Sequence, residues 1–198
     1  MALANRLADA QPTSMVGRRV SCVAGTAAGF SCSEADLLSV LTPEDLGAGM
    51  RCFDGASQVP RLCSLNDMWG WTDSETGNEY AIVGREDGTA FVDVTDPVNP
   101  VYLGELLPNE RVSGIWRDVK VYGTHAYIVA DRNGGLGLQI FDLTQLRDIE
   151  DPPVVFSTTA VYSMFERAHN IAINEETGFA YVVGISRGQR TCAAVDCT

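Results

Sequence analysis

A pattern of short strands recurs along this chain at an interval of about 50 residues. Asp67, Asp118 and Asn170 occupy the same position in three successive copies, 51 and then 52 residues apart. Each copy begins with a short strand, which a turn connects to an apolar second strand. A fixed interval of this size is typical of repeat architectures and suits a four-stranded blade of a β-propeller. The repeat therefore predicts an all-β fold of antiparallel four-stranded meanders.

The second copy, residues 117–167, shows the strands of the unit most clearly. Val119 and Val121 alternate with polar residues, 126–130 form an apolar second strand, and 138–143 form a third. A turn of helix is expected at 144–148. We predict the fourth strands at 101–104 in the first copy and at 154–156 in the second. Each follows a proline-bearing connection, where a strand can begin but cannot run through. Glycines 77 and 178 occupy matching hairpin positions and are predicted to adopt positive φ.

Composition divides the chain into a linker, a lead-in and the repeats. Residues 1–20 are small and polar without a period, which predicts a disordered segment or linker. Residues 21–65 form a cysteine-rich lead-in that we expect to be partly helical. Its two expected pieces are a helix capped by Ser33 that runs to residue 41, and one helical turn at 42–47.

Residues 66–198 hold the repeats, at 66–116, 117–167 and 168–198, of which the last is incomplete. They amount to about two and a half blades, whereas a propeller closes with about four or more. An open arc would leave sheet edges and apolar faces in water. We therefore expect the chain to be a fragment, or a shortened gene model, of a longer protein.

The net charge of −12 argues against two classes of partner. Nucleic acids and anionic membranes both require a basic face. The acidic balance is compatible with cation binding, although a solvated acidic surface explains it more simply. No window reaches the ~18 apolar residues of a membrane-spanning helix.

Six cysteines predict disulfides rather than a metal site. Four lie in the lead-in and two near the end: Cys22, Cys32, Cys52, Cys63, Cys192 and Cys197. None forms a C-x-x-C pair, and only two histidines are available to complete a zinc site. Disulfides indicate an oxidising compartment, and the pairing stays open. The first residues lack the apolar stretch of a signal peptide, which disagrees with an oxidising compartment. Either a missing upstream segment or an intracellular protein with unpaired thiols would resolve this disagreement.

Several long motifs point to one family. They are LNDMWGWTD, GNEYAIVG, GTAFVDVTDPVNPVYLGEL, WRDVKVYGTHAYIVAD, LQIFDLTQLR and AHNIAINEETGFAYVVG, preceded by CSEADLLSVL. Over residues 22–184 the chain resembles the choice-of-anchor B proteins, which carry LVIVD-type repeats. The resemblance implies a β-propeller-like domain that is secreted or attached to the cell surface. It implies an anchor, where one exists, outside this chain, and it implies no reaction.

Three polar pairs form the candidate site: Asn66 with Asp67, Arg117 with Asp118, and His169 with Asn170. First strands line the central channel of a propeller, so these pairs are expected to converge near the axis. There they could hold a ligand or a divalent cation such as calcium. Alternatively, each Asp or Asn ties its copy to the next through hydrogen bonds, and recurrence in every copy favours this role. Arg117 weakens the metal interpretation and could instead pair with Asp118.

Other sequence features suggest structure rather than chemistry. Residues 131–135 lack the acidic spacing of an EF-hand and are better explained as a turn. No nucleophile elbow or phosphate loop is present. The aromatic residues at strand positions are expected to lie mostly in the core between copies, with a sugar or peptide platform as the alternative for the first two: Trp69, Trp71, Trp116, Tyr122 and Tyr127.

These observations favour a non-enzymatic, extracellular or cell-surface binding module of β-propeller type. Its ligand would be a protein or a carbohydrate. The alternative is a metal-dependent hydrolase or lyase that uses Asp67, Asp118 and His169 around an axial ion.

Overall fold

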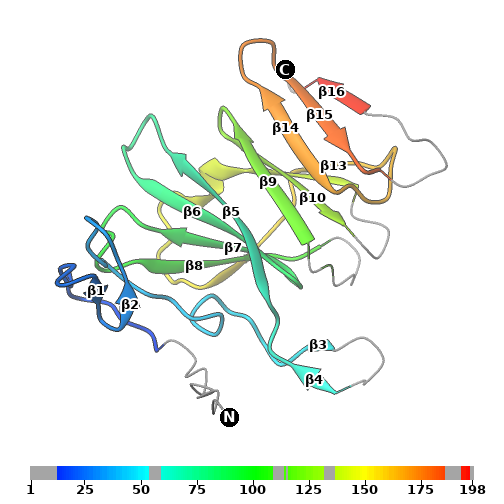
Figure 1. Cartoon of the computed structure of the whole chain (residues 1–198). Coiled ribbons are helices and arrows are strands. Elements are labelled where there is room, and N and C mark those ends of the chain that lie inside the picture. Colours follow the sequence, from blue (N-terminus) through cyan, green and yellow to red (C-terminus); the bar gives the residue numbers. More distant parts are fainter. Residues whose placement is uncertain are drawn as a thin grey trace.

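The computed structural model describes residues 13–53, 59–108, 114, 116–131, 137–185 and 193–196. Regular structure in these residues is almost entirely strand, which confirms the predicted all-β class. Three larger sheets follow one another along the chain (Figure 1). Two small hairpins belong to the lead-in, and their strands are β1 (Thr26–Ala27), β2 (Phe30–Ser31), β3 (Cys52–Phe53) and β4 (Pro60–Arg61). Among the described residues, no helix has the length and apolar character needed to span a bilayer.

Sheet 1 is built mainly from the first copy of the repeat. Its antiparallel strands are β5 (Leu65–Thr72), β6 (Glu79–Arg85), β7 (Gly88–Asp93) and β8 (Val101–Leu106). The predicted fourth strand of this copy is therefore confirmed. A fifth strand, β12 (Val154–Phe156), joins β8 in parallel.

Sheets 2 and 3 are antiparallel and come from the second and third copies. Sheet 2 has the order β13 (Ala160–Tyr162), β11 (Leu138–Asp142), β10 (His125–Asp131) and β9 (Trp116–Tyr122). Sheet 3 has the order β14 (Asn170–Asn174), β15 (Phe179–Val183) and β16 (Ala193–Asp196). The 3-10 helix η1 (Leu143–Leu146) follows β11, where a turn of helix was expected. Gly77 and Gly178 have φ angles of 78° and 72°, as the hairpin positions predicted.

The strand predicted as the fourth of the second copy forms, but the prediction of the sheet that it joins is wrong. Residues 154–156 do form a strand, but β12 pairs with β8 of sheet 1. The fourth strand of sheet 2 is β13, six residues further along, which pairs with β11. The chain therefore passes from sheet 2 to sheet 1 at β12 and returns to sheet 2 at β13.

The helix predicted at 34–41 is also wrong. Glu34 adopts a φ of 55°, which an α-helix does not allow. Leu37 and Val40 exchange backbone hydrogen bonds with Val20 and Met15, so their amides are unavailable to a helix. The two partners lie within the segment predicted as a linker, and these bonds hold both in place.

The helical turn predicted at 42–47 is a hydrogen-bonded turn instead. Thr42 Oγ1 accepts from the Asp45 amide at 3.3 Å, and the Asp45 carboxylate accepts from the Thr42 amide at 2.7 Å. This is the reciprocal capping pattern of a helix start. The chain nevertheless leaves the turn at Gly47, with a φ of 74°, before a helix forms.

Two disulfides fix the lead-in, Cys22–Cys32 and Cys52–Cys63. The disulfide prediction is confirmed for these four cysteines, and the pairing is local. Cys192 and Cys197 lie outside the described residues.

Apolar cores fill the spaces between neighbouring sheets. Between sheets 1 and 2, the Phe91 and Phe141 rings stack with centroids 4.6 Å apart, and Phe156 of β12 meets both edge-on. Between sheets 2 and 3, the core includes Tyr127, Val129, Ile171, Ala180 and Val182. Burial of this apolar surface is the main force that holds the sheets together.

The aromatic residues predicted for the core divide into two groups. Trp71 and Tyr127 are buried, and Tyr122 packs against the core between sheets 2 and 3. Trp69 and Trp116 are exposed to 40% and 50%, so the core prediction is wrong for these two.

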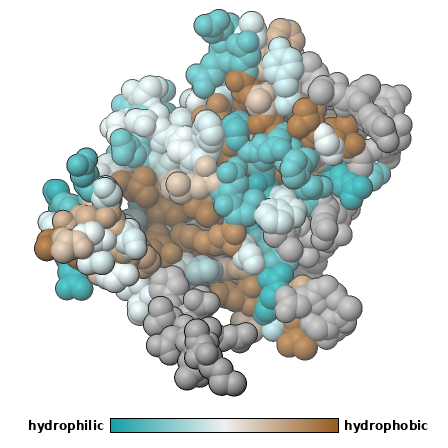
Figure 2. Space-filling view, viewed as in Figure 1, coloured by the Kyte–Doolittle hydropathy of each residue, from teal (hydrophilic) through white to brown (hydrophobic). Residues whose placement is uncertain are grey.

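The lead-in lies against the outer face of sheet 1. Leu46 packs with Ala90 and Val92, and further apolar side chains surround them: Leu41, Leu65, Ala81, Val83, Val94 and Tyr102. Figure 2 shows apolar side chains gathered beside the lead-in, and hydrophilic ones gathered over β9 and the start of β14.

A bidentate ion pair connects the turn after β5 of sheet 1 to the residue that ends η1. Arg147 Nε and Nη2 donate to the two carboxylate oxygens of Asp73, at 2.7 and 2.8 Å. These hydrogen bonds outweigh burial and lower the pKa of Asp73 from 3.8 to about 2, with help from the amide of Glu75 and the hydroxyl of Thr76.

Arg147→Ala is expected to destabilise the protein at neutral pH and to have less effect in acid. Because the pKa of Asp73 is depressed on folding, its stabilisation is complete above pH 4 and is lost as the pH falls toward 2. Thermal melts of both proteins from pH 6 to pH 2 should show the Tm difference shrinking across that window. Arg147→Lys, which keeps the charge without the fork, serves as the control. A pH-independent difference would contradict the assignment.

Candidate functional site

The three first strands bring the predicted polar pairs together. β5, β9 and β14 lie side by side and run in the same direction, with β9 in the middle (Figure 1). At the end where they begin, a hollow of about 510 Å³ opens, lined by Leu65, Asn66, Asp67, Trp116, Arg117, Asp118, His169 and Asn170. All six residues of the predicted pairs are in this list. The structure therefore brings the three predicted pairs to one hollow.

Asp67 and Asp118 tie each first strand to the next. Asp67 Oδ2 accepts a hydrogen bond from the Val119 amide at 3.0 Å. One copy further along, Asp118 Oδ2 accepts from the Ile171 amide at 2.7 Å and from Asn170 Nδ2 at 3.2 Å. The predicted structural role of these recurring acids is thus confirmed.

Asp118 is a buried carboxylate that stays ionised. Burial alone would raise its pKa, but hydrogen bonds from Lys120 Nζ, the Ile171 amide and Asn170 outweigh that effect and lower the pKa. Its ion-pair partner is Lys120, on the same strand. The predicted pairing of Asp118 with Arg117 is therefore wrong.

Arg117 points away from Asp118 and into the protein. It is only 3% exposed, and its Nε donates to the Arg85 carbonyl at 2.6 Å. Nη1 is buried and has no hydrogen-bond partner among the described residues. Burial lowers the pKa of Arg117 to about 10, an effect that Asp87 opposes and Arg85 reinforces. The guanidinium therefore keeps its charge at neutral pH.

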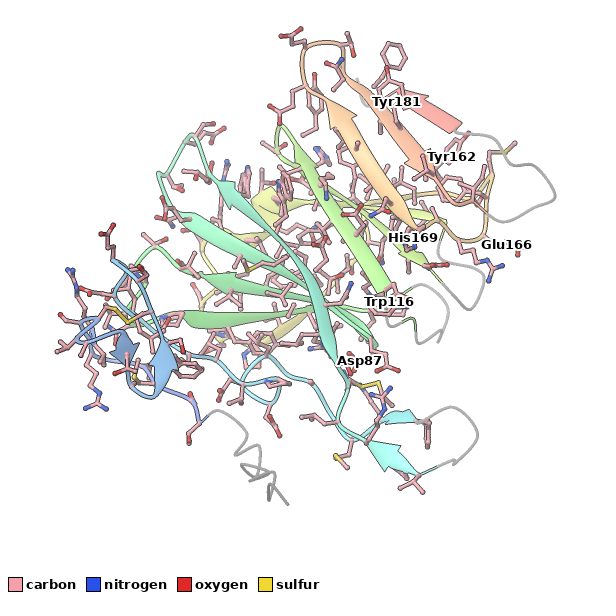
Figure 3. The ribbon with its side chains drawn as sticks, viewed as in Figure 1. Asp87, Trp116, Tyr162, Glu166, His169 and Tyr181 are labelled. Atoms are coloured by element: carbon pink, nitrogen blue, oxygen red, sulfur yellow. A yellow bond between two sulfur atoms is a disulfide. The ribbon has the colours of Figure 1, made fainter. Side chains whose placement is uncertain are left out.

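His169 and Trp116 are exposed members of the hollow, as are Asn66 and Asn170. Figure 3 places Trp116 at the start of β9 and His169 just before β14, at the same end of the two strands. The imidazole of His169 is largely exposed, and its Nδ1 lies 2.8 Å from Asp131 Oδ2 on β10. The remaining residues predicted as a turn, 132–135, lie outside the described residues.

Two glycines make room for the polar side chains. A Cβ at Gly84 would lie 2.9 Å from Asn66 Oδ1 and 3.2 Å from Arg117 Cβ. Asn66 can therefore approach closely enough for its Nδ2 to donate to the Arg117 carbonyl at 2.7 Å. At the corresponding end of β15, Gly184 has a φ of 70°, and a Cβ there would collide with His169.

The donor set is poorly arranged for a metal ion. Among the described residues, no three His, Cys, Asp or Glu side chains come together as a possible ion site. Asp67 and Asp118 each commit an oxygen to a backbone amide, and Asp118 is also paired with Lys120. The arrangement is better suited to a polar organic ligand than to a cation.

Sequence reasoning found the polar lining but missed two contributors. Lys120 neutralises Asp118, and Trp116 lines the hollow instead of the core. Trp116 directly precedes Arg117, a member of the predicted polar pairs, and this neighbouring position was a usable signal that Trp116 lines the hollow. No family model, curated protein or solved structure matches this chain, and function is therefore inferred from the geometry of the hollow.

Proposed function

We propose that this chain is a non-enzymatic binding module of the β-propeller type and that its ligand occupies the axial hollow. The observation that carries the proposal is the hollow itself, where equivalent ends of three first strands present polar groups around one space of about 510 Å³.

The chemistry of the lining favours binding over catalysis. A general base needs a carboxylate or imidazole that is free to take a proton. Asp118 instead accepts from Ile171, Asn170 and Lys120, which lower its pKa. The alternative, a hydrolase or lyase around an axial ion, gains no support from the described donor groups.

Within binding, a carbohydrate suits the lining best. Trp116 is half exposed and offers an aromatic face on which the C–H side of a sugar ring can pack. Asn170 and His169 can donate or accept hydrogen bonds, and Asp67 can accept them from hydroxyl groups. A mixture of one aromatic platform and several polar groups fixes orientation as well as affinity.

The location we propose is extracellular or at the cell surface. Two local disulfides support it, because such bonds persist in oxidising compartments. The resemblance to the choice-of-anchor B proteins supports the same location.

Trp116→Ala is expected to abolish or strongly weaken glycan binding while leaving the fold intact. The side chain is half exposed, so the expected change in Tm is small. Loss of an aromatic anchor from a binding site typically weakens affinity tenfold or more, corresponding to about 1.4 kcal/mol. Binding of the purified protein to a printed array of neutral and acidic glycans measures the effect.

Trp69→Ala is the matched control for this experiment. Trp69 is also exposed, at 40%, and lies on β5, but it does not line the hollow. It should retain binding. If no glycan binds the wild-type protein, or if both variants lose binding equally, the proposed site is wrong.

A further inference from the structure

Sheet 3 turns an uncharged and largely apolar face to solvent. Side chains alternate between the two sides of a strand, and on β15 Ala180 and Val182 are buried against sheet 2. The three residues that alternate with them are 39–45% exposed, and the register of β14 and β15 places three exposed residues of β14 opposite them on the same side. We call these six residues the outer face of sheet 3: Asn170, Ala172, Asn174, Phe179, Tyr181 and Val183.

The outer face of sheet 3 corresponds to a face of sheet 2 that is buried. Val129 pairs with the recurring polar residue of the second copy, and Val183 pairs with that of the third, so the two valines are equivalent. Tyr127 and Tyr181 are equivalent for the same reason, two residues earlier. Tyr127 and Val129 are buried because sheet 3 packs on them, whereas Tyr181 and Val183 are exposed. An exposed apolar face of this kind marks a site of protein–protein contact.

The outer face of sheet 3 lacks the carboxylate that ties one copy to the next. Asp67 and Asp118 each use a carboxylate oxygen to accept a backbone amide of the next first strand. Asn170 stands at the third equivalent position and carries an amide instead. Its Nδ2 donates to Asp118, and its side-chain oxygen accepts no hydrogen bond from the described residues. This face therefore departs from the pattern that binds a following copy, and an amide, which both donates and accepts, can pair with a second amide.

The two ends of the row of sheets differ in what covers them. Figure 1 shows sheet 3 at one end and the lead-in at the other. The lead-in covers sheet 1 through Leu46, which packs on Ala90 and Val92. The outer face of sheet 3 therefore cannot stack on sheet 1 of another copy to build an open chain. Contact between two outer faces uses the same surface on both copies, and it closes at a dimer.

Charge favours this face over the rest of the surface for contact between copies. The chain carries a net charge of −12, so two copies repel each other wherever acids face acids. None of the six residues of the outer face is charged. The neighbouring acids in sequence, Glu175 and Glu176, lie in the turn between β14 and β15 and outside the face.

We propose that the outer face of sheet 3 is a self-association surface, on which two copies of this chain pack about a twofold axis. Phe179 and Tyr181 of each copy provide the apolar contact, as the centres of protein interfaces are enriched in aromatic residues and depleted in charged ones. Six residues from each copy are fewer than the about 20–30 of a standard interface, so we expect a weak dimer with a Kd on the order of 10–100 µM. The dimer goes beyond the proposed function, and it requires no ligand in the hollow.

Sedimentation equilibrium of the purified 198-residue chain tests the proposal. Concentrations from about a tenth of the expected Kd to about ten times that value should show a monomer–dimer equilibrium without larger species. Added salt should strengthen the dimer, because it screens the repulsion between two acidic chains. A chain that stays monomeric throughout overturns the proposal and leaves the face to another occupant, such as a further sheet of the same repeat. Oligomers that keep growing with concentration overturn the twofold contact.

Tyr181→Arg locates the dimer at the outer face of sheet 3. The variant brings a positive charge from each copy into the contact, so the Kd should rise tenfold or more. Tyr181 is 45% exposed, and the thermal melt of the variant should therefore stay close to that of the wild type. Val155→Arg is the matched control, because Val155 is also exposed but lies on β12 of sheet 1. It should leave the Kd unchanged.

Hydroxyl-radical labelling of the wild-type protein gives a second readout that depends on no variant. Labelling of Phe179 and Tyr181 should fall as the dimer forms, whereas Trp69, which is exposed on sheet 1, should keep its labelling. Protection of the two residues on sheet 3 together with loss of the dimer in Tyr181→Arg supports the proposal. A dimer that forms without this protection, or that Tyr181→Arg leaves intact, uses another surface and overturns it.

Discussion

Arg85→Met is expected to destabilise the protein by about 3–5 kcal/mol, the usual result of breaking a buried ion pair from one side. Arg85 is completely buried. Its Nε donates to Asp87 at 2.9 Å, its Nη1 donates to the Leu46 carbonyl at 2.6 Å, and its Nη2 pairs with Glu105. Removal of the guanidinium would leave both carboxylates short of a partner, and it would release the lead-in from sheet 1.

Arg51→Met is the matched control for that substitution. Arg51 contacts the same two carboxylates, Asp87 and Glu105, but its side chain is about half exposed. Exposed ion pairs are worth about 0–1 kcal/mol, so this variant should be close to wild type. Urea unfolding of the three proteins gives the free energies directly. If the two variants lost equal stability, the buried position of Arg85 would not be the cause.

The sequence was informative where the repeat itself determines the structure. Equivalent positions in successive copies fall on equivalent strands, and equivalent strands pack side by side. Asp67 and Asp118 could therefore be predicted to lie close together and to tie neighbouring copies to each other. Each accepts a hydrogen bond from a backbone amide of the next first strand, Val119 for Asp67 and Ile171 for Asp118. Nothing in that pattern distinguishes Lys120 from Arg117 as the partner of Asp118. That choice depends on the directions of the side chains, and Gly84 leaves Arg117 the space to extend toward Arg85.

Strand pairing at the sheet edges could not be predicted from periodicity. Residues 154–156 have the apolar character of a strand, but that character is compatible with either sheet. The structure places β12 beside β8, where Gly104 lets the two backbones approach closely. A Cβ at Gly104 would overlap the Val154 carbonyl oxygen. Phe156 also gains two aromatic partners, Phe91 and Phe141, in this position.

Local helix propensity misled the prediction for the lead-in. Residues 34–41 follow a capping serine, Ser33, and have an apolar pattern, but an isolated helix of this length is marginal in water. The Asp36 carboxylate accepts from the Cys22 amide at 2.9 Å, next to the Cys22–Cys32 disulfide. Backbone pairing with residues 15 and 20 then replaces the helical hydrogen bonds. Tertiary contacts of this kind are invisible to a local pattern.

Asp118→Ala is expected to cost about 3 kcal/mol and to loosen sheet 3 from sheet 2. The buried carboxylate accepts from the Ile171 amide, from Asn170 and from Lys120, and hydrogen bonds to a charged group are worth about 1.5–3 kcal/mol each. Truncation leaves the Ile171 amide without an acceptor between the two sheets. Amide hydrogen exchange at Ile171 should therefore accelerate more than at Val119, which Asp67 still holds.

Asp118→Asn separates the hydrogen bond from the charge. The amide oxygen can still accept from Ile171, but it no longer neutralises Lys120, so the expected loss of stability is smaller than for alanine. Since folding lowers the pKa of Asp118, its ionised form stabilises the protein at neutral pH and loses this effect as the pH falls through the depressed pKa. The difference between wild type and either variant should accordingly shrink in acid. An alanine variant with unchanged Ile171 exchange and unchanged stability would show that Asp118 does not tie the sheets, and its place in the lining would then need a ligand to explain it.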